Sequence, residues 1–149
     1  VLGVFALILS GSYMVGYGAG SSCGTWPLCR GSLMPDGAAY AIHMAHRYLA
    51  AAVGLLLVAT MVSAWSRRGQ RPELGWGSLL LLAAFTAQVI AGAAIVWTDF
   101  SSQLKAIHLS LATLVWVATV SLAVLTFSTE RIQLKSGEIA VSPAPGLKA

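Results

Sequence analysis

The chain has 149 residues, of which 57% are hydrophobic and 9% are charged, and its mean hydropathy is +0.78. Soluble domains carry about a quarter charged residues, so this composition excludes an ordinary water-soluble protein. The net charge of +4 does not predict a nucleic-acid partner, because the basic residues lie in short connections between apolar runs. Lipid headgroups and membrane topology account for them instead.

Four stretches without any charged residue are each close to the length of a membrane span: 1–29, 48–66, 74–98 and 106–129. A bilayer core about 30 Å thick is crossed by roughly 20 apolar residues in a helix. The sequence therefore predicts an all-α integral membrane protein, a bundle of four transmembrane helices built from two helix hairpins. The predicted spans are about residues 1–17, 38–65, 74–97 and 105–127.

These spans form a predicted membrane domain, residues 1–128, which is followed by a polar tail, residues 129–149. The tail contains Pro143 and Pro145 and is predicted to be disordered. Because Val1 opens directly in an apolar run, with no Met and no basic segment before it, we expect the natural N-terminus to be missing or processed.

The connection between the second and third spans is the most basic short loop, because it carries three arginines within Arg67–Arg71. The tail adds Arg131 and Lys135. The positive-inside rule places both segments in the cytoplasm, so the connections 18–37 and 98–103 are external. We expect the protein to reside in the plasma membrane of a bacterium or archaeon.

This orientation places Cys23 and Cys29 on the oxidising side of the membrane, where a disulfide persists. The sequence therefore predicts a disulfide between them. The alternative is a pair of free thiols in a turn.

Three histidines, His43, His46 and His108, fall inside or at the edge of predicted spans, where ionisable groups are costly and usually functional. The second and fourth spans run in the same direction, so His46 and His108 lie within roughly 10 Å of the outer end of parallel helices. Both histidines begin the pattern H-x-x-L-A, which suggests a duplicated hairpin with a ligand site at the repeat interface. Two imidazoles at matching depth predict the axial ligands of one haem iron, suited to electron transfer. Zinc is a poor competitor, because a tetrahedral site needs three or four ligands.

Three polar residues near this pair have two interpretations each. Arg47 is expected either to bind a haem propionate or to extend to the outer interface. Gln88 is expected to hydrogen-bond the cofactor or to tie helices together, and His43 to take part in the site or to bond a neighbouring helix. The glycines of the first and third spans are interpreted as close helix contacts.

Several motifs of the chain occur together in one known family of membrane proteins. They are the run Gly18–Cys29 ending in Trp-Pro-Leu-Cys, the run His43–Arg47, the run Gln88–Gly92 and the helix of His108. With these motifs the chain resembles the haem A synthase family, whose members convert haem O to haem A for terminal oxidases. The resemblance covers about residues 11–125 and corresponds to one four-helix half of the family's eight-helix architecture.

The resemblance implies that His46 and His108 are the axial pair of one haem and that Cys23 and Cys29 form an external disulfide loop. It implies haem b as cofactor, or haem O and haem A as substrate and product. Family members oxidise a haem methyl group to a formyl by successive hydroxylations. The catalytic half usually has a Glu three residues before the ligand His, and His43 stands at that position here. The unit is therefore expected either to catalyse this oxidation or to supply the half that holds the cofactor haem.

Two other interpretations stay open at this stage. One is a non-catalytic b-type cytochrome or assembly subunit of a respiratory or photosynthetic complex, which the missing Glu favours and the cysteine loop disfavours. The other is a membrane scaffold without a cofactor, against which the H-x-x-L-A repetition argues. The expected partners are the lipid bilayer, haem, a second copy or a second four-helix half, and a haem O synthase or an oxidase complex.

Overall fold

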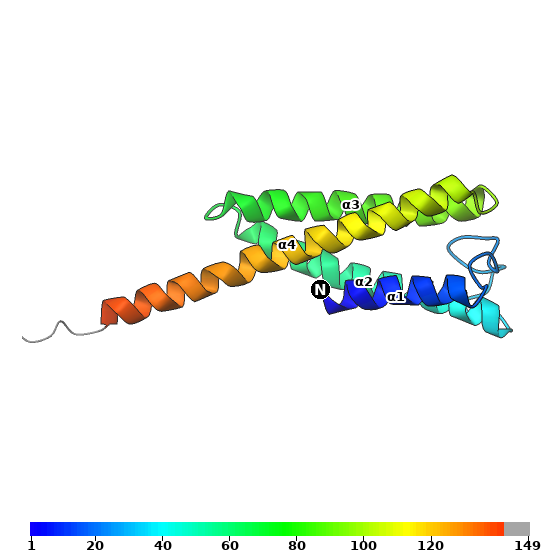
Figure 1. Ribbon diagram of the computed structural model, residues 1–149, viewed down its shortest axis with the longest axis horizontal. Helices are drawn as coiled ribbons and strands as arrows, with labels where there is room; N and C mark the ends of the chain where they lie inside the picture. The colour runs from blue at the N-terminus through cyan, green and yellow to red at the C-terminus, as the bar shows by residue number, and fades with distance from the viewer. Residues whose placement is uncertain (142–149) are drawn as a thin grey trace, which may run out of the picture.

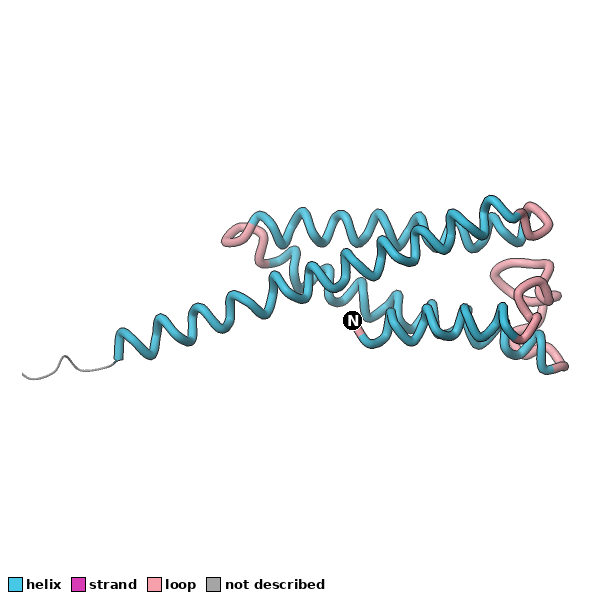
Figure 2. The backbone as a smooth tube through the Cα atoms, in the orientation of Figure 1, coloured by secondary structure: helices cyan, strands magenta, loops and turns pink. Residues whose placement is uncertain are grey.

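The computed structural model describes the backbone of residues 1–141 and the side chains of residues 1–127. In this part of the chain the regular elements are four helices, drawn in Figures 1 and 2. They are α1 (Leu2–Gly16), α2 (Ala38–Ser66), α3 (Pro72–Trp97) and α4 (Ser102–Val141).

Three of these helices are long and apolar enough to cross a membrane: α2, α3 and the Ser102–Phe127 part of α4. The helix α1 is apolar but has only 15 residues, fewer than the roughly 17–25 residues of a typical span. The prediction of an all-helical membrane protein is therefore confirmed, with three membrane-length helices and one shorter helix.

Local sequence sets where α3 begins and how it is held against α4. Pro72 occupies the first turn, where its fixed φ suits a helix and its missing N–H would have no partner anyway. Arg71, just before it, binds the Glu73 carboxylate at 2.8 Å and donates to the carbonyl oxygen of Leu125 on α4 at 3.0 Å. The short connection between α2 and α3 is thereby fastened to the neighbouring hairpin.

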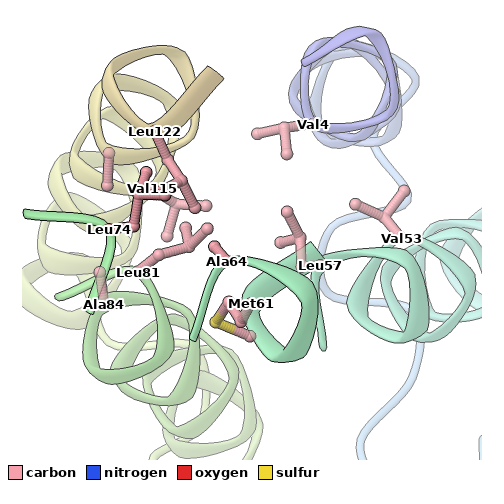
Figure 3. Packing of buried hydrophobic residues seen from close by; sticks show 11 residues of the cluster. Val4, Val53, Leu57, Met61, Ala64, Leu74, Leu81, Ala84, Val115 and Leu122 are labelled. Carbon is pink, nitrogen blue, oxygen red and sulfur yellow. The ribbon is translucent and has the colours of Figure 1, made fainter. Parts of the chain in front are cut away.

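The helices are arranged as two pairs, α1 with α2 and α3 with α4, and α2 also packs against α3. In Figure 1 the two pairs stand apart at the end that carries the long loop, and α4 also packs against α1. The main apolar core, shown in Figure 3, joins all four helices and lies toward the α2–α3 connection. Its buried members are Val4, Val53, Leu57, Met61, Ala64, Leu74, Leu81, Ala84, Val115, Ala118 and Leu122.

Along the helices, this core lies farther from the disulfide-bonded loop between α1 and α2 than the histidines do. On α2 it begins at Val53, seven residues after His46, which corresponds to about 10 Å along the helix. On α4 it begins at Val115, seven residues after His108. The two hairpins are thus joined by apolar packing in one half of the bundle, and the other half carries the histidines.

The helix α4 continues to Val141, beyond the end near Phe127 that the sequence analysis expects. The segment 128–141 contains no proline, and its helix-forming Glu, Arg, Gln, Leu and Lys residues outweigh Gly137, so the helix continues through it. The predicted disordered tail is therefore helical in its first part, and residues 142–149 lie outside the described residues. The division into a membrane domain, 1–128, and a cytoplasmic tail stays a prediction.

Candidate functional site

The connection between α1 and α2, residues 17–37, contains the disulfide that the sequence analysis expects between Cys23 and Cys29. Both cysteines are fully buried and pack against Met44 of α2, with Tyr40 beside them. We call residues 17–37 the disulfide loop. Its Trp26 ring contacts the Trp97 ring at the end of α3 in an edge-to-face geometry, with 5.8 Å between ring centroids. The loop therefore reaches from the first hairpin to the second.

Arg47 fixes the disulfide loop to α2 through backbone carbonyl groups. Its Nη1 donates to the oxygens of Thr25 and Pro27 at 2.8 and 2.9 Å, and its Nη2 lies 3.5 Å from the oxygen of Cys23. Guanidinium groups present several donors in a fixed planar geometry, which suits several acceptors of one loop. Arg47 is thus a clamp on the loop, and the propionate contact stays a prediction.

His43 is 6% exposed and joins this clamp to Ala19, near the start of the disulfide loop. Its Nδ1 lies 3.0 Å from the carbonyl oxygen of Ala19, and its Nε2 lies 3.3 Å from Nη2 of Arg47. A carbonyl can only accept and a guanidinium can only donate, so Nδ1 carries the proton and Nε2 is the acceptor. Since Arg47 occupies the Nε2 lone pair, the structure gives His43 the role of linking two segments.

His46 lies on the same helix but contacts α1. Its Nδ1 is 2.8 Å from Oγ of Ser10, and that hydroxyl also lies 2.7 Å from the carbonyl oxygen of Leu7. The hydroxyl proton is given to Leu7, so Ser10 accepts the Nδ1 proton of His46. This leaves Nε2 of His46 with an unshared lone pair and no hydrogen bond among residues 1–127.

His108 of α4 has the equivalent setting against α3. Its Nδ1 lies 3.1 Å from the backbone oxygen of Gln88, which can only accept, so Nδ1 again carries the proton. Its Nε2 accepts from the side-chain amide of Gln88 at 3.3 Å. The amide oxygen Oε1 of Gln88 is buried and has no hydrogen-bond partner in the described part of the chain.

A glycine of the neighbouring helix lies against each of these two rings. A Cβ added to Gly11 of α1 would lie 3.1 Å from Cε1 of His46, 3.7 Å from Nδ1 and 3.8 Å from Nε2. A Cβ added to Gly92 of α3 would lie 3.1, 3.5 and 4.0 Å from the same atoms of His108. The two hairpins therefore place their histidines in nearly the same way, as expected for a duplicated unit.

This arrangement can hold a metal-bound macrocycle between the hairpins. Histidines that ligate metals usually donate their other ring N–H to a carbonyl, carboxylate or similar acceptor, which fixes the ring and its tautomer. His46 and His108 both meet this condition. The chemistry of the donor set fits an iron with two axial imidazoles. Within residues 1–127, no group of three or more His, Cys, Asp or Glu side chains gathers in the way that would hold a bare metal ion.

Four of the five predicted site residues lie in two contact groups, Arg47 with His43 and Gln88 with His108, and the fifth, His46, is held from α1. The contact of Ser10 with His46 is not predicted from the sequence, and Gly11 and Gly92 are predicted only as helix contacts. The sequence does contain a signal for these contacts. In each hairpin the first helix carries a polar residue and a glycine, and the second helix carries the histidine that they contact.

Comparison with known proteins gives a family match over most of the chain. Residues 36–144 match the COX15-CtaA family, whose description is cytochrome oxidase assembly protein. The chain is 29% identical over 135 residues to a haem A synthase of Shouchella clausii (strain KSM-K16), covering 89% of this chain and 45% of that protein. It is 35% identical over 120 residues to protoheme IX farnesyltransferase 1 of Natronomonas pharaonis, covering 80% of this chain and 25% of that protein.

The chain therefore spans less than half the length of these two curated relatives. A third relative, a haem A synthase of Alkalihalophilus pseudofirmus, is 29% identical over 87% of this chain. The match covers 45% of that protein, as it does for the haem A synthase of Shouchella clausii. No solved structure matches the chain.

Proposed function

Because the chain belongs to the COX15-CtaA family of cytochrome oxidase assembly proteins, we propose that it acts in haem A biosynthesis by holding one haem between His46 and His108. The observation that carries this proposal is the matched setting of the two rings. On each hairpin the neighbouring helix accepts the Nδ1 proton, so that Nε2 keeps the lone pair that iron requires.

The residues around the rings bind and orient such a group. Ser10 and the backbone oxygen of Gln88 set the ring planes, while Gly11 and Gly92 let the neighbouring helices approach those rings closely. A haem with two axial imidazoles supplies one-electron transfer when bound. The apolar core on one side and the disulfide loop on the other side limit the access of water to this region.

Electron transfer is favoured over hydroxylation for this unit. The hydrogen bonds of the three histidines in residues 1–127 go to serine, amide, guanidinium and carbonyl groups, and none goes to a carboxylate. The position of the family's Glu is held by His43, whose two ring nitrogens are engaged by Ala19 and Arg47. The unit therefore corresponds best to the half that holds the cofactor haem b.

The proposal includes a membrane arrangement in which α1 also crosses the bilayer, giving a bundle of four spans made of two hairpins. The arginines of Arg67–Arg71 and the tail lie in the cytoplasm, and the disulfide loop lies outside. A second unit of similar size, either a second copy or a second four-helix half, completes the assembly, in keeping with relatives of which this chain covers 45%. A haem O synthase or an oxidase complex is the expected neighbour.

The test is the haem content and absorption spectrum of the purified protein. We expect about one haem b per chain by pyridine haemochrome, with the low-spin spectrum of two axial imidazoles. His46→Ala and His108→Ala are expected to abolish that spectrum, and the matched control His43→Gln is expected to keep it. An unchanged low-spin spectrum in both alanine variants would overturn the haem proposal.

A second candidate function is the oxidation of haem O to haem A by this unit itself. The similarity to haem A synthases over 87–89% of the chain favours it. The two functions are separated by mass analysis of extracted haem from cells grown with and without a haem O supply. Haem A that appears only with haem O would establish turnover, whereas haem b under both conditions supports the electron-transfer unit.

A further inference from the structure

The two histidines differ in one respect, which is the state of their Nε2 atoms. Nε2 of His108 accepts a hydrogen bond from the side-chain amide of Gln88 at 3.3 Å, whereas Nε2 of His46 has no hydrogen bond among residues 1–127. Iron uses the same lone pair that the amide occupies. The lone pair of His46 Nε2 is therefore not shared with a donor in residues 1–127, whereas that of His108 is released only when the Gln88 side chain moves.

Gln88 is held in this position weakly. Its hydrogen bond to His108 is long, and its Oε1 is buried without a partner in the described residues. The opposite orientation of the amide would place Oε1 against the Nε2 lone pair, because Nδ1 carries the only ring proton. We call the observed position of the Gln88 side chain, with its amide on Nε2 of His108, the closed position. A buried carbonyl oxygen without a partner costs free energy, so a second position in which Oε1 gains a partner competes with the closed one.

We propose that Gln88 is a latch on His108, so that haem binds His46 first and His108 second, when the latch opens. This inference rests on the proposed haem site and goes beyond it by giving the two ligands an order. The backbone oxygen of the same residue accepts the Nδ1 proton, and this contact does not depend on where the Gln88 side chain lies. When the Gln88 side chain moves away, the Nε2 lone pair of His108 becomes free, while the hydrogen bond at Nδ1 keeps the ring in place.

The separation of these two contacts makes the latch testable by substitution. Gln88→Met keeps a side chain of similar length and keeps the backbone oxygen, but it removes the amide donor. Gln88→Ala is a second variant in case methionine packs poorly. Gln70→Met is the matched control, because Gln70 is exposed in the connection between α2 and α3.

The experiment is stopped-flow absorption after haemin is mixed with the haem-free protein in detergent. We expect two phases in the unsubstituted protein: formation of a five-coordinate, high-spin species, then conversion to the six-coordinate, low-spin species. Loss of one hydrogen bond predicts that Gln88→Met speeds the second phase by about three- to tenfold. Gln70→Met is expected to leave both phases unchanged.

A double substitution separates the latch from a general effect on packing. His46→Ala leaves only His108, so haemin association is expected to be slow, and adding Gln88→Met is expected to restore its rate. In His108→Ala the first phase is expected to stay fast and to be insensitive to Gln88→Met. Equal rates with and without Gln88→Met in the His46→Ala background would overturn the latch, while failure of the unsubstituted protein to bind haemin would overturn the haem site itself.

Discussion

Gly92 of α3 lies against the imidazole of His108 of α4, so close that a Cβ at this position would be 3.1 Å from Cε1 of the ring. Helices in a membrane gain little hydrophobic free energy by meeting one another, so their association depends on close packing through small residues. Here the small residue packs on a side chain instead of a backbone. The position of the His108 ring is therefore set by the neighbouring helix as much as by its own.

Substitution of Gly92 by alanine is expected to displace the ring with little effect on folding. Alanine favours a helix by about 1 kcal/mol over glycine, which offsets the cost of the contact. The free energy of unfolding should therefore change by less than about 1 kcal/mol, while haem affinity falls by roughly tenfold, as is usual when the support of a ligand histidine is disturbed. Haemin titration and thermal unfolding measure the two effects.

The control for this substitution is Gly16→Ala, because nothing lies within 4 Å of a Cβ at Gly16. It is expected to leave haem affinity unchanged. Equal losses of affinity in the Gly92 and Gly16 variants would show that the ring contact does not set the ligand position.

The three membrane-length helices and the matching settings of His46 and His108 could be predicted because both leave a strong mark on the sequence. Long stretches without charge mark the helices, and the H-x-x-L-A pattern at matching depth marks His46 and His108. The contacts of the rings could not be predicted in the same way. A glycine in a membrane helix indicates close packing, but the pattern does not say whether a backbone or an imidazole lies opposite.

The partners of Arg47 illustrate a second reason for the limit. The sequence offers a haem propionate or the interface as its partner, whereas the structure shows carbonyl oxygens of the disulfide loop. Every residue has a backbone carbonyl group, so backbone acceptors leave no pattern in the sequence. From the sequence alone, an arginine that binds loop carbonyls therefore cannot be distinguished from one that binds a ligand. The prediction of a disordered tail rests on its polar composition and on Pro143 and Pro145, which follow the helical residues 129–141 and so do not interrupt them.

His43→Ala is expected to lower stability and to retain haem. The substitution removes the acceptor of an Arg47 N–H and one of the donors to the Ala19 oxygen, which keeps its hydrogen bonds from Ser22, and this loss costs about 1–3 kcal/mol. His43→Gln offers a donor and an acceptor again and should recover part of that loss. Thermal unfolding and haem content per chain are the measurements, and complete loss of haem in a folded His43→Ala protein would identify His43 as a ligand.

Arg47→Ala is expected to release the disulfide loop from α2. Three loop carbonyls lose a charged donor, so cleavage of the loop by added protease should become faster by at least tenfold, since hydrogen bonds to charged groups contribute about 1.5–3 kcal/mol. Arg47→Lys should recover little, because an ammonium group lacks the planar arrangement of donors. Arg67→Ala, at the exposed end of α2, is the control, and equal cleavage rates in the Arg47 and Arg67 variants would exclude the clamp.

The Cys23–Cys29 disulfide is expected to resist reduction in the folded protein. Both sulfur-bearing side chains are fully buried against Met44 of α2, so a reductant in water cannot reach them without opening the loop. Incubation with a mild thiol in non-denaturing detergent, followed by alkylation and mass analysis, should label almost no cysteine, and the same treatment in SDS should label both. Because Arg47 holds the loop closed, Arg47→Ala should allow labelling in the mild detergent as well. Rapid reduction of the unsubstituted protein would mean that the loop opens readily and that its burial does not protect the bond.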